Sequence, residues 1–457
     1  MAYSSSTSAL VYAATVAVPS IASTRPDDDI TKAKAWHNKS GGFNNPWPSW
    51  NMHSVTTIIG GMLMRRFSGR ANQPDTTPPT VPVHTPTFLP SRTSNPTTLR
   101  ATWLGHACYY VEFPSGVRVL FDPVFTDRCS PFSWLGPKRY TEMPCGIKDI
   151  PTIDAVVISH NHYDHLSHPT IMEIVKLHPE CHFFVPLGNK KWFEACGIKN
   201  KCTEMDWWDE VDFTLAPSAS SGSADKMSVT STDTSTPTPK PAADTITSRI
   251  TCLPCQHMSA RSIHDRCATL WASWSVSSGG KSVYFGGDTG YRSVPKDSDG
   301  KDDWAEEYSN LPHCPAFKDI GRLRGPFDLG LIPIGAYMPR WIMSPMHADP
   351  RDAVEIFRDT QCKKALGIHW GTWVLTEEDV LEPPRLLKKA LAHHSMPETG
   401  VFDVWDLKHR QQTPTNDLNS VPSQSHPSDR HRNGLFALGR PQTASSDKHV
   451  PKHVLRV

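Results

Sequence analysis

The sequence predicts an α/β fold, in which helices pack in layers on a core of β-strands. Short apolar runs that suit buried strands recur along the chain, at residues 117–121, 153–159, 282–285, 329–334 and 365–368. Helix signals lie between these runs, at 169–177 and 349–361. This alternation is typical of layered α/β proteins rather than of all-strand sandwiches or helical bundles.

Turn and cap residues support individual elements. Strands are expected at 101–113 and 117–121, joined by a turn at Pro114-Ser115-Gly116. In the helix at 349–361, Asp349 can cap the first turn and Pro350 suits the first helical position. The apolar residues that follow recur at helical spacing, which indicates one buried helix face.

The composition limits the class of protein. The chain has 457 residues, of which 38% are hydrophobic, below the roughly 45–50% of compact chains. The net charge of +1 argues against a protein that binds nucleic acid through bulk charge. The odd count of eleven cysteines favours a reducing, cytoplasmic compartment over a disulfide scaffold. No run reaches the roughly 18 apolar residues of a membrane-spanning helix.

We expect one folded domain at 43–409, with unfolded segments around and within it. Residues 1–42 are rich in Ser, Thr and Ala and then charged, and residues 410–457 form a basic tail. A low-complexity insertion rich in Ser, Thr and Pro occupies 217–247, and a charged loop insertion occupies 293–310. No positive region precedes the apolar residues 10–22, so a disordered or membrane-touching tail is favoured over a cleaved signal.

The segment 159–166 carries the clearest chemistry. It places His160, His162, Asp164 and His165 within six residues, directly after an apolar strand. Imidazole and carboxylate groups are ligands that zinc and similar divalent metals prefer. The first two can point one way while the last two point another, so one loop could serve two ions.

Three further residues occupy comparable places. His257 follows a short apolar stretch, Asp288 follows the strand at 282–285, and His369 follows the strand at 365–368. Sites in layered α/β proteins gather at the carboxyl ends of strands. Each of these residues alone has an ordinary structural explanation, but together with 159–166 they predict a dinuclear metal centre.

These motifs resemble a known family. The run 160–165 matches the HxHxDH motif of the metallo-β-lactamase superfamily, and His257, Asp288 and His369 follow in its order. Further blocks resemble the N-acyl-phosphatidylethanolamine-hydrolysing phospholipase D family within it. These blocks lie at 45–50, 102–107, 136–140, 158–166, 206–208, 287–291, 325–329, 332–337 and 368–372.

The resemblance implies an αββα sandwich that holds two Zn²⁺ ions. One ion would be bound by His160, His162 and His257, the other by Asp164, His165 and His369, with Asp288 bridging them. The expected catalytic residues are Asp164, Asp288 and His347. Asp122 matches an aspartate that orients the ligand loop, because ligating imidazoles need their other N–H held.

The resemblance also implies a substrate and a setting. The expected reaction is hydrolysis of N-acyl-phosphatidylethanolamine to N-acylethanolamine and phosphatidate. The partners would be a phospholipid substrate and, peripherally, a membrane, without nucleic acid, and a homodimer is one assembly to test. Trp47, Trp50, Trp207 and Trp208 could line an apolar cleft or a membrane interface, although core packing explains each of them equally well.

Other functions stay open at this point. A hydrolase of the same fold could act on a lactone, a phosphorylated sugar or another phosphodiester, and a non-catalytic member of the fold is a third alternative. Met258 and Met338 depart from the phospholipase pattern near the expected cleft. They leave the metal ligands intact but put the acyl-chain and head-group preference in question.

Overall fold

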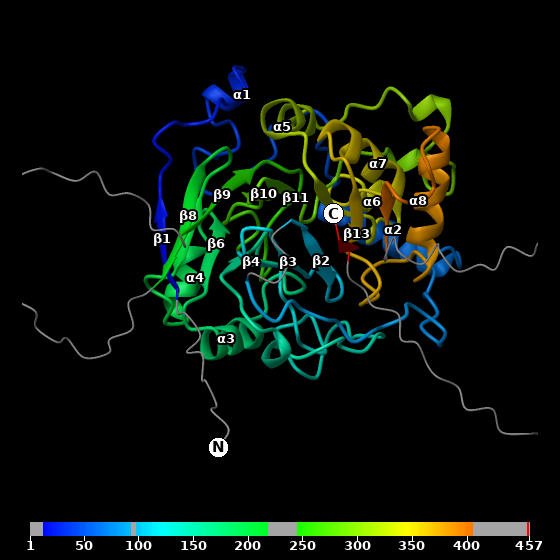
Figure 1. The fold of residues 1–457 in the computed structure, drawn as a ribbon. Helices are drawn as coiled ribbons and strands as arrows, with labels where there is room; N and C mark the ends of the chain where they lie inside the picture. Colours follow the sequence, from blue (N-terminus) through cyan, green and yellow to red (C-terminus); the bar gives the residue numbers. More distant parts are fainter. Residues whose placement is uncertain (1–11, 93–96, 218–244, 405–454, 457) are drawn as a thin grey trace, which may run out of the picture.

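Two mixed β-sheets lie face to face, with helices on their outer sides (Figure 1). The computed structural model describes residues 12–92, 97–217, 245–404 and 455–456. One sheet has the strand order β1-β8-β9-β10-β11-β12-β13-β14, and the other has β15-β2-β3-β4-β5-β6-β7. This is the predicted α/β sandwich with the layer order helix, sheet, sheet, helix.

The seven-stranded sheet comes mainly from the first half of the chain. Its strands β2 to β4 form an antiparallel meander, and β4 to β7 run parallel. The strands are β2 (Arg100–Trp103), β3 (Tyr109–Glu112), β4 (Arg118–Phe121), β5 (Ala155–Val157), β6 (His182–Pro186), β7 (Cys202–Met205) and β15 (Leu455–Arg456).

The eight-stranded sheet comes mainly from the second half. Strands β1 and β8 to β11 pair antiparallel, and β11 to β14 pair parallel. The strands are β1 (Tyr12–Ala17), β8 (Glu210–Pro217), β9 (Ile246–Leu253), β10 (Ser273–Ser278), β11 (Lys281–Phe285), β12 (Leu329–Pro333), β13 (Ala365–Ile368) and β14 (Phe402–Asp403).

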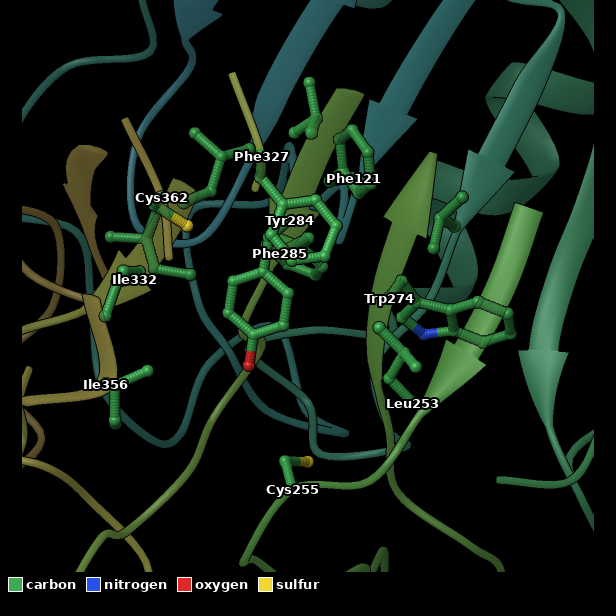
Figure 2. Close-up of a cluster of buried hydrophobic side chains, with 14 of the residues drawn as sticks. Phe121, Leu253, Cys255, Trp274, Tyr284, Phe285, Phe327, Ile332, Ile356 and Cys362 are labelled. Atoms are coloured by element: carbon green, nitrogen blue, oxygen red, sulfur yellow. The ribbon is translucent and has the colours of Figure 1, made fainter. Parts of the chain in front are cut away.

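Alternating side chains of each strand fill two hydrophobic layers. In β4, Val119 and Phe121 point into the core between the sheets, where the Phe121 ring lies 4.8 Å from that of Phe285 (Figure 2). Leu120, between them, joins the outer cluster with Ile171 of α3. This two-residue period is what a strand buried on both faces requires.

Helices cover the outer faces. The helices α3 (His168–Leu177) and α4 (Lys190–Ala195) pack on the seven-stranded sheet. On the other sheet, α7 (Pro350–Asp359) packs on β12 and contacts α5 (Ala316–Arg324) and α8 (Glu382–His393). The other helices are α1 (Asp29–Lys32), α2 (Val55–Phe67) and α6 (Arg340–Met343). Among the described helices, none is long and apolar enough to cross a bilayer.

The predicted helix at 349–361 forms as its cap residues indicate. The Asp349 carboxylate accepts the backbone N–H of Asp352 at 2.8 Å, and Pro350 opens the helix. The loop expected at 293–310 contains only two 3-10 turns, at Lys296–Ser298 and Glu306–Tyr308. The buried Arg292 and the partly buried Arg340 bind the Asp303 carboxylate and also Asp352 of α7, and so fix this loop against α7.

Two expectations about order and length are wrong. The strand predicted at 101–113 is interrupted, because Gly105 and His106 adopt positive φ and turn the chain between β2 and β3. Residues 12–42 are not a disordered segment: β1 pairs with β8, and the buried Trp36 donates its indole N–H to Asp206 at 2.8 Å. Most of the insertion 217–247 and of the tail 410–457 lies outside the described residues.

Candidate metal centre

The predicted ligands come from both sheets and lie close together. The loop 158–166 follows β5 of the seven-stranded sheet, whereas His257, Asp288 and His369 follow β9, β11 and β13 of the other. Each residue therefore lies where a strand ends, as the sequence predicts. The positive φ of His369, +62°, turns its side chain out of the strand direction at this point.

The first group contains His160, His162, His257 and Asp288, whose ligand atoms all lie within 4.8 Å of one another. His160 Nε2 is 2.8 Å from His162 Nδ1, and His257 Nε2 is 3.3 Å from the same atom. The Met346 carbonyl oxygen, 3.0 Å from His257 Nδ1, orients the His257 ring so that its Nε2 faces the other ligands. Asn45 also donates to the His257 carbonyl oxygen at 2.7 Å, which attaches the segment before α2 to the site.

The second group contains His106, Asp164, His165 and His369, within the same limit. Asp288 Oδ2 joins the two groups: it lies 2.9 Å from His369 Nε2 and 3.1 Å from His165 Nε2, but also 3.7 Å from His257 Nε2. The predicted ligands thus divide into the two expected sets, with Asp288 at the junction. Asp164 is the most open of the carboxylates, with 14% of its side chain exposed.

Asp122 makes hydrogen bonds to the loop 158–166, in which four of the predicted ligands lie. Its Oδ2 accepts from His165 Nδ1 at 2.6 Å, and its Oδ1 accepts the Ser159 N–H at 2.7 Å. The Ser159 hydroxyl also bonds Asp122 and lies 2.9 Å from His160 Nδ1. One buried carboxylate therefore directs an imidazole of each group toward the centre.

His347 lies beside the centre, at its predicted place. Its Nδ1 is 4.0 Å from Asp288 Oδ2, and its ring centroid is 5.0 Å from that of His369. Burial lowers the pKa of His347 to about 3, despite the opposing charge of Asp288. A neutral imidazole at this position offers one N–H donor and one acceptor to a bound molecule.

His106 belongs to the centre although sequence reasoning did not assign it a role. Its Nε2 lies 3.0 Å from Asp164 Oδ2, and its ring centroid is 4.1 Å from that of His369. The His106 carbonyl oxygen accepts the backbone N–H of His369 at 3.1 Å. The available signal was Gly105-His106 at the end of an apolar run, which matches the strand-end pattern of the other ligands.

The buried charges of the site depend on one another. Burial acts to raise the pKa of Asp288, but His165 and His369 outweigh it and hold that pKa well below its usual value. Burial likewise opposes the charge of His369, yet Asp288 raises its pKa to about 9. In contrast, burial lowers the pKa values of His160 and His257 well below normal, so these imidazoles stay neutral.

The chemistry of this donor set fits metal ions. Both Asp288 carboxylate oxygens and His165 Nε2 are buried and make no well-aligned hydrogen bond among the described residues, although Asp288 Oδ2 lies close to His165 Nε2 and His369 Nε2. Buried polar groups are rarely left unpaired, because desolvation costs about 1–3 kcal/mol for each group. Unpaired imidazole and carboxylate atoms that converge on one point are therefore best satisfied by divalent cations.

An open cleft leads to the second group. His106 and His369 form part of its wall, which continues with Tyr140, Leu375 and Glu378. Glu378 accepts the backbone N–H groups of Ala336 and Met338 at 2.5 and 3.1 Å, so it fixes the loop that bears Met338. The cleft therefore reaches the second group through His106 and His369.

Comparison with known proteins identifies the family. A model of the beta-lactamase superfamily domain matches residues 117–370. N-acyl-phosphatidylethanolamine-hydrolyzing phospholipase D 1 of Caenorhabditis elegans is 34% identical over 383 residues, which cover 80% of this chain and 93% of that protein. The mitochondrial enzyme of the same name from Saccharomyces cerevisiae is 29% identical, covering 67% of this chain and 54% of its own. An uncharacterized protein of Mycobacterium tuberculosis is 32% identical and covers 78% of this chain and 80% of its own.

The match to the family model spans both sheets and reaches from β4 to the strand-end residue His369. The chain is therefore a metal-dependent hydrolase, and it belongs to the metallo-β-lactamase superfamily and, within it, to the family of the N-acyl-phosphatidylethanolamine-hydrolysing phospholipases D.

Proposed function

We propose that this protein hydrolyses N-acyl-phosphatidylethanolamine to phosphatidate and N-acylethanolamine, with two Zn²⁺ ions as cofactors. The observation that carries the proposal is Asp288, whose carboxylate lies between two separate sets of ligands. The Caenorhabditis and Saccharomyces relatives are named for this reaction, which supports the same substrate class here.

The geometry supports the following ligand sets. His160, His162 and His257 would hold one ion, Asp164, His165 and His369 the other, and Asp288 would touch both. Two divalent ions so held can polarise phosphodiester oxygens and lower the pKa of water, which supplies a nucleophile near neutral pH. The chain's own residues set the rest: Asp122 and Ser159 orient the imidazoles. Asp164 keeps 14% of its side chain exposed, and His347 lies beside Asp288.

His347 suits a role at the phosphate. Because it is neutral and has no hydrogen-bond partner at Nδ1 among the described residues, it can hydrogen-bond a substrate oxygen. A hydrogen bond at that point would orient the phosphate group for in-line displacement and stabilise charge that develops on it.

A phospholipid substrate requires contact with a membrane, and two exposed apolar segments support it. In α2, Ile59, Leu63, Met64 and Phe67 are exposed, Phe67 to 85%. In the loop after β4, Phe132, Trp134 and Leu135 are exposed, Trp134 to 71%. We call these two segments together the apolar rim. Exposed aromatic and long apolar side chains of this kind insert into bilayer interfaces.

The apolar rim lies beside the cleft. The segment 373–379 connects the two: Glu377 binds Arg65 of α2, and Trp373 and Leu375 pack on Val124 and Cys129 of the loop after β4. Leu375 and Glu378 of the same segment line the cleft. A bilayer on the apolar rim would therefore present its lipid head groups to the centre.

Two further expectations remain proposals. All eleven cysteines are free, which supports a reducing, cytoplasmic setting at the membrane surface. The net charge of +1 gives no sign of the basic surface that nucleic-acid binding requires. This favours a lipid substrate over nucleic acid. A homodimer stays a prediction.

The test is product analysis on purified protein of known metal content. N-acyl-phosphatidylethanolamine in mixed micelles should yield phosphatidate and N-acylethanolamine, detected by mass spectrometry, and a chelator should abolish their release. Asp288→Asn should release neither product. Protein that holds two zinc ions per chain but releases nothing would overturn the phospholipase proposal and direct the search to lactones, phosphorylated sugars and other phosphodiesters.

A further inference from the structure

The loop that bears His257 contains an arginine, Arg261, that reaches across to the other sheet. This loop connects β9 to β10 of the eight-stranded sheet. Arg261 is partly buried and donates from one nitrogen, Nη1, to the carbonyl oxygens of Asn161 at 2.8 Å and Leu166 at 2.9 Å. Both acceptors belong to the loop 158–166, which follows β5 of the seven-stranded sheet. One side chain therefore connects the ligand-bearing loops of the two sheets.

The two acceptors lie next to predicted ligands of both groups. Asn161 lies between His160 and His162 of the first group. Leu166 directly follows His165 of the second group. Hydrogen bonds from a guanidinium are charge-assisted and stronger than those between neutral groups. Because one nitrogen binds both carbonyl oxygens, it holds the two ends of the ligand-bearing turn at a fixed separation.

Tyr163, inside the same turn, packs on the face of this guanidinium. Arg261 Cζ lies 4.0 Å from the centroid of the Tyr163 ring, and the Tyr163 hydroxyl donates to the Arg261 carbonyl oxygen at 3.3 Å. The ring of Trp192 in α4 lies 5.6 Å from the same Cζ. A planar guanidinium can stack on a ring and donate from its edge at the same time, whereas an ammonium group cannot stack.

The backbone of Arg261 is itself held in a turn. The Asp265 carboxylate accepts the backbone N–H of Arg261 at 3.0 Å and that of Ser262 at 2.7 Å, and it also accepts the Ser262 hydroxyl at 3.0 Å. Both hydrogen bonds that the Arg261 guanidinium makes to described residues go to the loop 158–166. This side chain therefore extends from an ordered turn to one defined target, unlike a solvated surface arginine.

We propose that Arg261 is a positioning residue of the metal centre, which holds the turn 160–166 in the shape that presents ligands of both groups. It acts through backbone carbonyl oxygens, and it does not line the cleft that leads to the second group. A turn that sampled other shapes would have to be ordered by the metal ions, and this cost would weaken their binding.

This inference rests on the metal centre of the proposed function but not on its substrate. The measurement is metal affinity, with no phospholipid present. The chain can therefore fail to hydrolyse N-acyl-phosphatidylethanolamine while Arg261 still positions the ligands. Equally, Arg261 can prove unimportant for metal binding while the chain hydrolyses the lipid.

The test compares Zn²⁺ affinity of the full-length parent with that of Arg261→Ala and Arg261→Lys, by competition with a chromophoric chelator. Arg261→Ala should weaken the binding of both ions by about 10–100-fold, the range for residues that support metal ligands. Arg261→Lys should recover part of this loss, because an ammonium can donate to the carbonyl oxygens but cannot stack on Tyr163. Arg266→Ala is the matched control: Arg266 lies in the same loop, is exposed and contacts the Met52 sulfur.

Two further readouts separate positioning from a general loss of stability. Zn²⁺ should raise the melting temperature of Arg261→Ala less than that of Arg266→Ala, whereas the metal-free melting temperatures should be similar. The visible spectrum of bound Co²⁺, which depends on ligand geometry, should change only in the Arg261 variants. Parent-like Zn²⁺ affinity in Arg261→Ala, or an equal loss of melting temperature with and without Zn²⁺, would overturn the proposal. If Arg261→Ala does not fold, parent-like Zn²⁺ affinity in Arg261→Lys would overturn it.

Discussion

His106 contacts two of the three predicted ligands of the second group. Its ring nitrogen reaches Asp164 Oδ2 and its carbonyl oxygen holds the backbone of His369, so it contacts the second group twice and the first group not at all. Its own backbone N–H donates to the Thr372 hydroxyl at 2.7 Å, which fixes the turn. We infer that His106 positions the second group rather than the first.

We predict that His106→Ala loses metal selectively. Outer partners of metal ligands typically contribute about 10–100-fold in affinity. Bound metal should therefore fall from two ions toward one per chain when free metal is limiting, as measured by elemental analysis. His106→Gln, which keeps a donor, should retain more of the second ion. His182→Ala, at a buried histidine that bonds Thr203, is the control. Equal loss of both ions would contradict this positioning role.

Asp206, which follows β7, binds three residues of the N-terminal segment. Its buried carboxylate accepts from Lys34, Trp36 and His37 at 2.8, 2.8 and 3.0 Å. Burial acts to raise the pKa of Asp206, but these three partners outweigh it and lower the pKa below its usual value. A lowered pKa in the folded protein stabilises the fold above the pKa of the unfolded chain.

We predict that Asp206→Asn lowers the free energy of unfolding by about 2 kcal/mol at neutral pH, the order expected for a buried charged hydrogen-bond acceptor. The difference from the parent should vanish as the pH falls below about 4 and through the lowered pKa, because the carboxyl group is then protonated in both states. Thermal melts between neutral and acidic pH measure it. Asp212→Asn, at a half-exposed pair with Arg249, is the control. A pH-independent difference would contradict the assignment.

At the residue scale, the sequence predicted most residues of the centre but missed His106. The seven expected ligands, His347 and Asp122 all lie together, because residues at strand ends converge when parallel strands share an edge. His106 escaped because the apolar run 101–113 reads as one strand. Only the positive φ of Gly105 and His106 creates the turn that presents the ring, and a backbone reversal at a non-glycine residue leaves little trace in the sequence.

At the element scale, the N-terminal segment is the largest difference from expectation. Residues 12–42 are rich in Ser, Thr and Ala and then charged, so composition predicts disorder. Yet β1 finds the free edge of β8, and backbone hydrogen bonds there do not depend on side-chain composition. Trp36 then supplies one large buried side chain. Such pairing at a distance cannot be predicted from a local window of sequence.

The helix α2 departs from the usual burial of apolar residues. Only Gly61 and Arg65 are buried within it: Gly61 lies against the Trp341 ring, and Arg65 binds Asp299 and Glu377. Polar contacts therefore hold the helix down while its apolar side chains face outward, the reverse of a core helix. This arrangement suits a helix that contacts the apolar part of a membrane.

We predict that Phe67→Glu combined with Trp134→Glu lowers binding to phosphatidylcholine vesicles by at least about tenfold, because each change removes roughly 1.5–3 kcal/mol of burial. Vesicle sedimentation measures it, and hydrolysis of micellar substrate should fall less. Val18→Glu is the matched control, since Val18 is 81% exposed but lies next to β1, at the far edge of the sheet from α2 (Figure 1). Unchanged vesicle binding in the double variant would remove the apolar rim from the membrane contact.

At the scale of the whole molecule, the metal centre joins the two sheets. The loop after β5 brings His160, His162, Asp164 and His165 from one sheet, and the other sheet brings His257, Asp288 and His369. The layers themselves were predictable from the alternation of strands and helices. Their strand order was not, because the pairing of β4 with β5 and of β11 with β12 joins segments that are separated by long connections.

Because the centre joins both sheets, we expect metal binding to stabilise the whole fold. Ions that bind the folded chain and not the unfolded one stabilise it by about 3–4 kcal/mol at 100–1,000 times the dissociation constant. We therefore predict that chelation lowers the melting temperature by at least about 5 °C. It should also speed hydrogen exchange in strands of both sheets, since ligands of each sheet lose their shared partner. Differential scanning calorimetry and hydrogen exchange measure the two effects. In Asp288→Asn, which lacks the residue between the two groups, the chelator should produce a much smaller shift. A shift of equal size in that variant, or exchange that rises in one sheet alone, would show that the centre does not hold the sheets together.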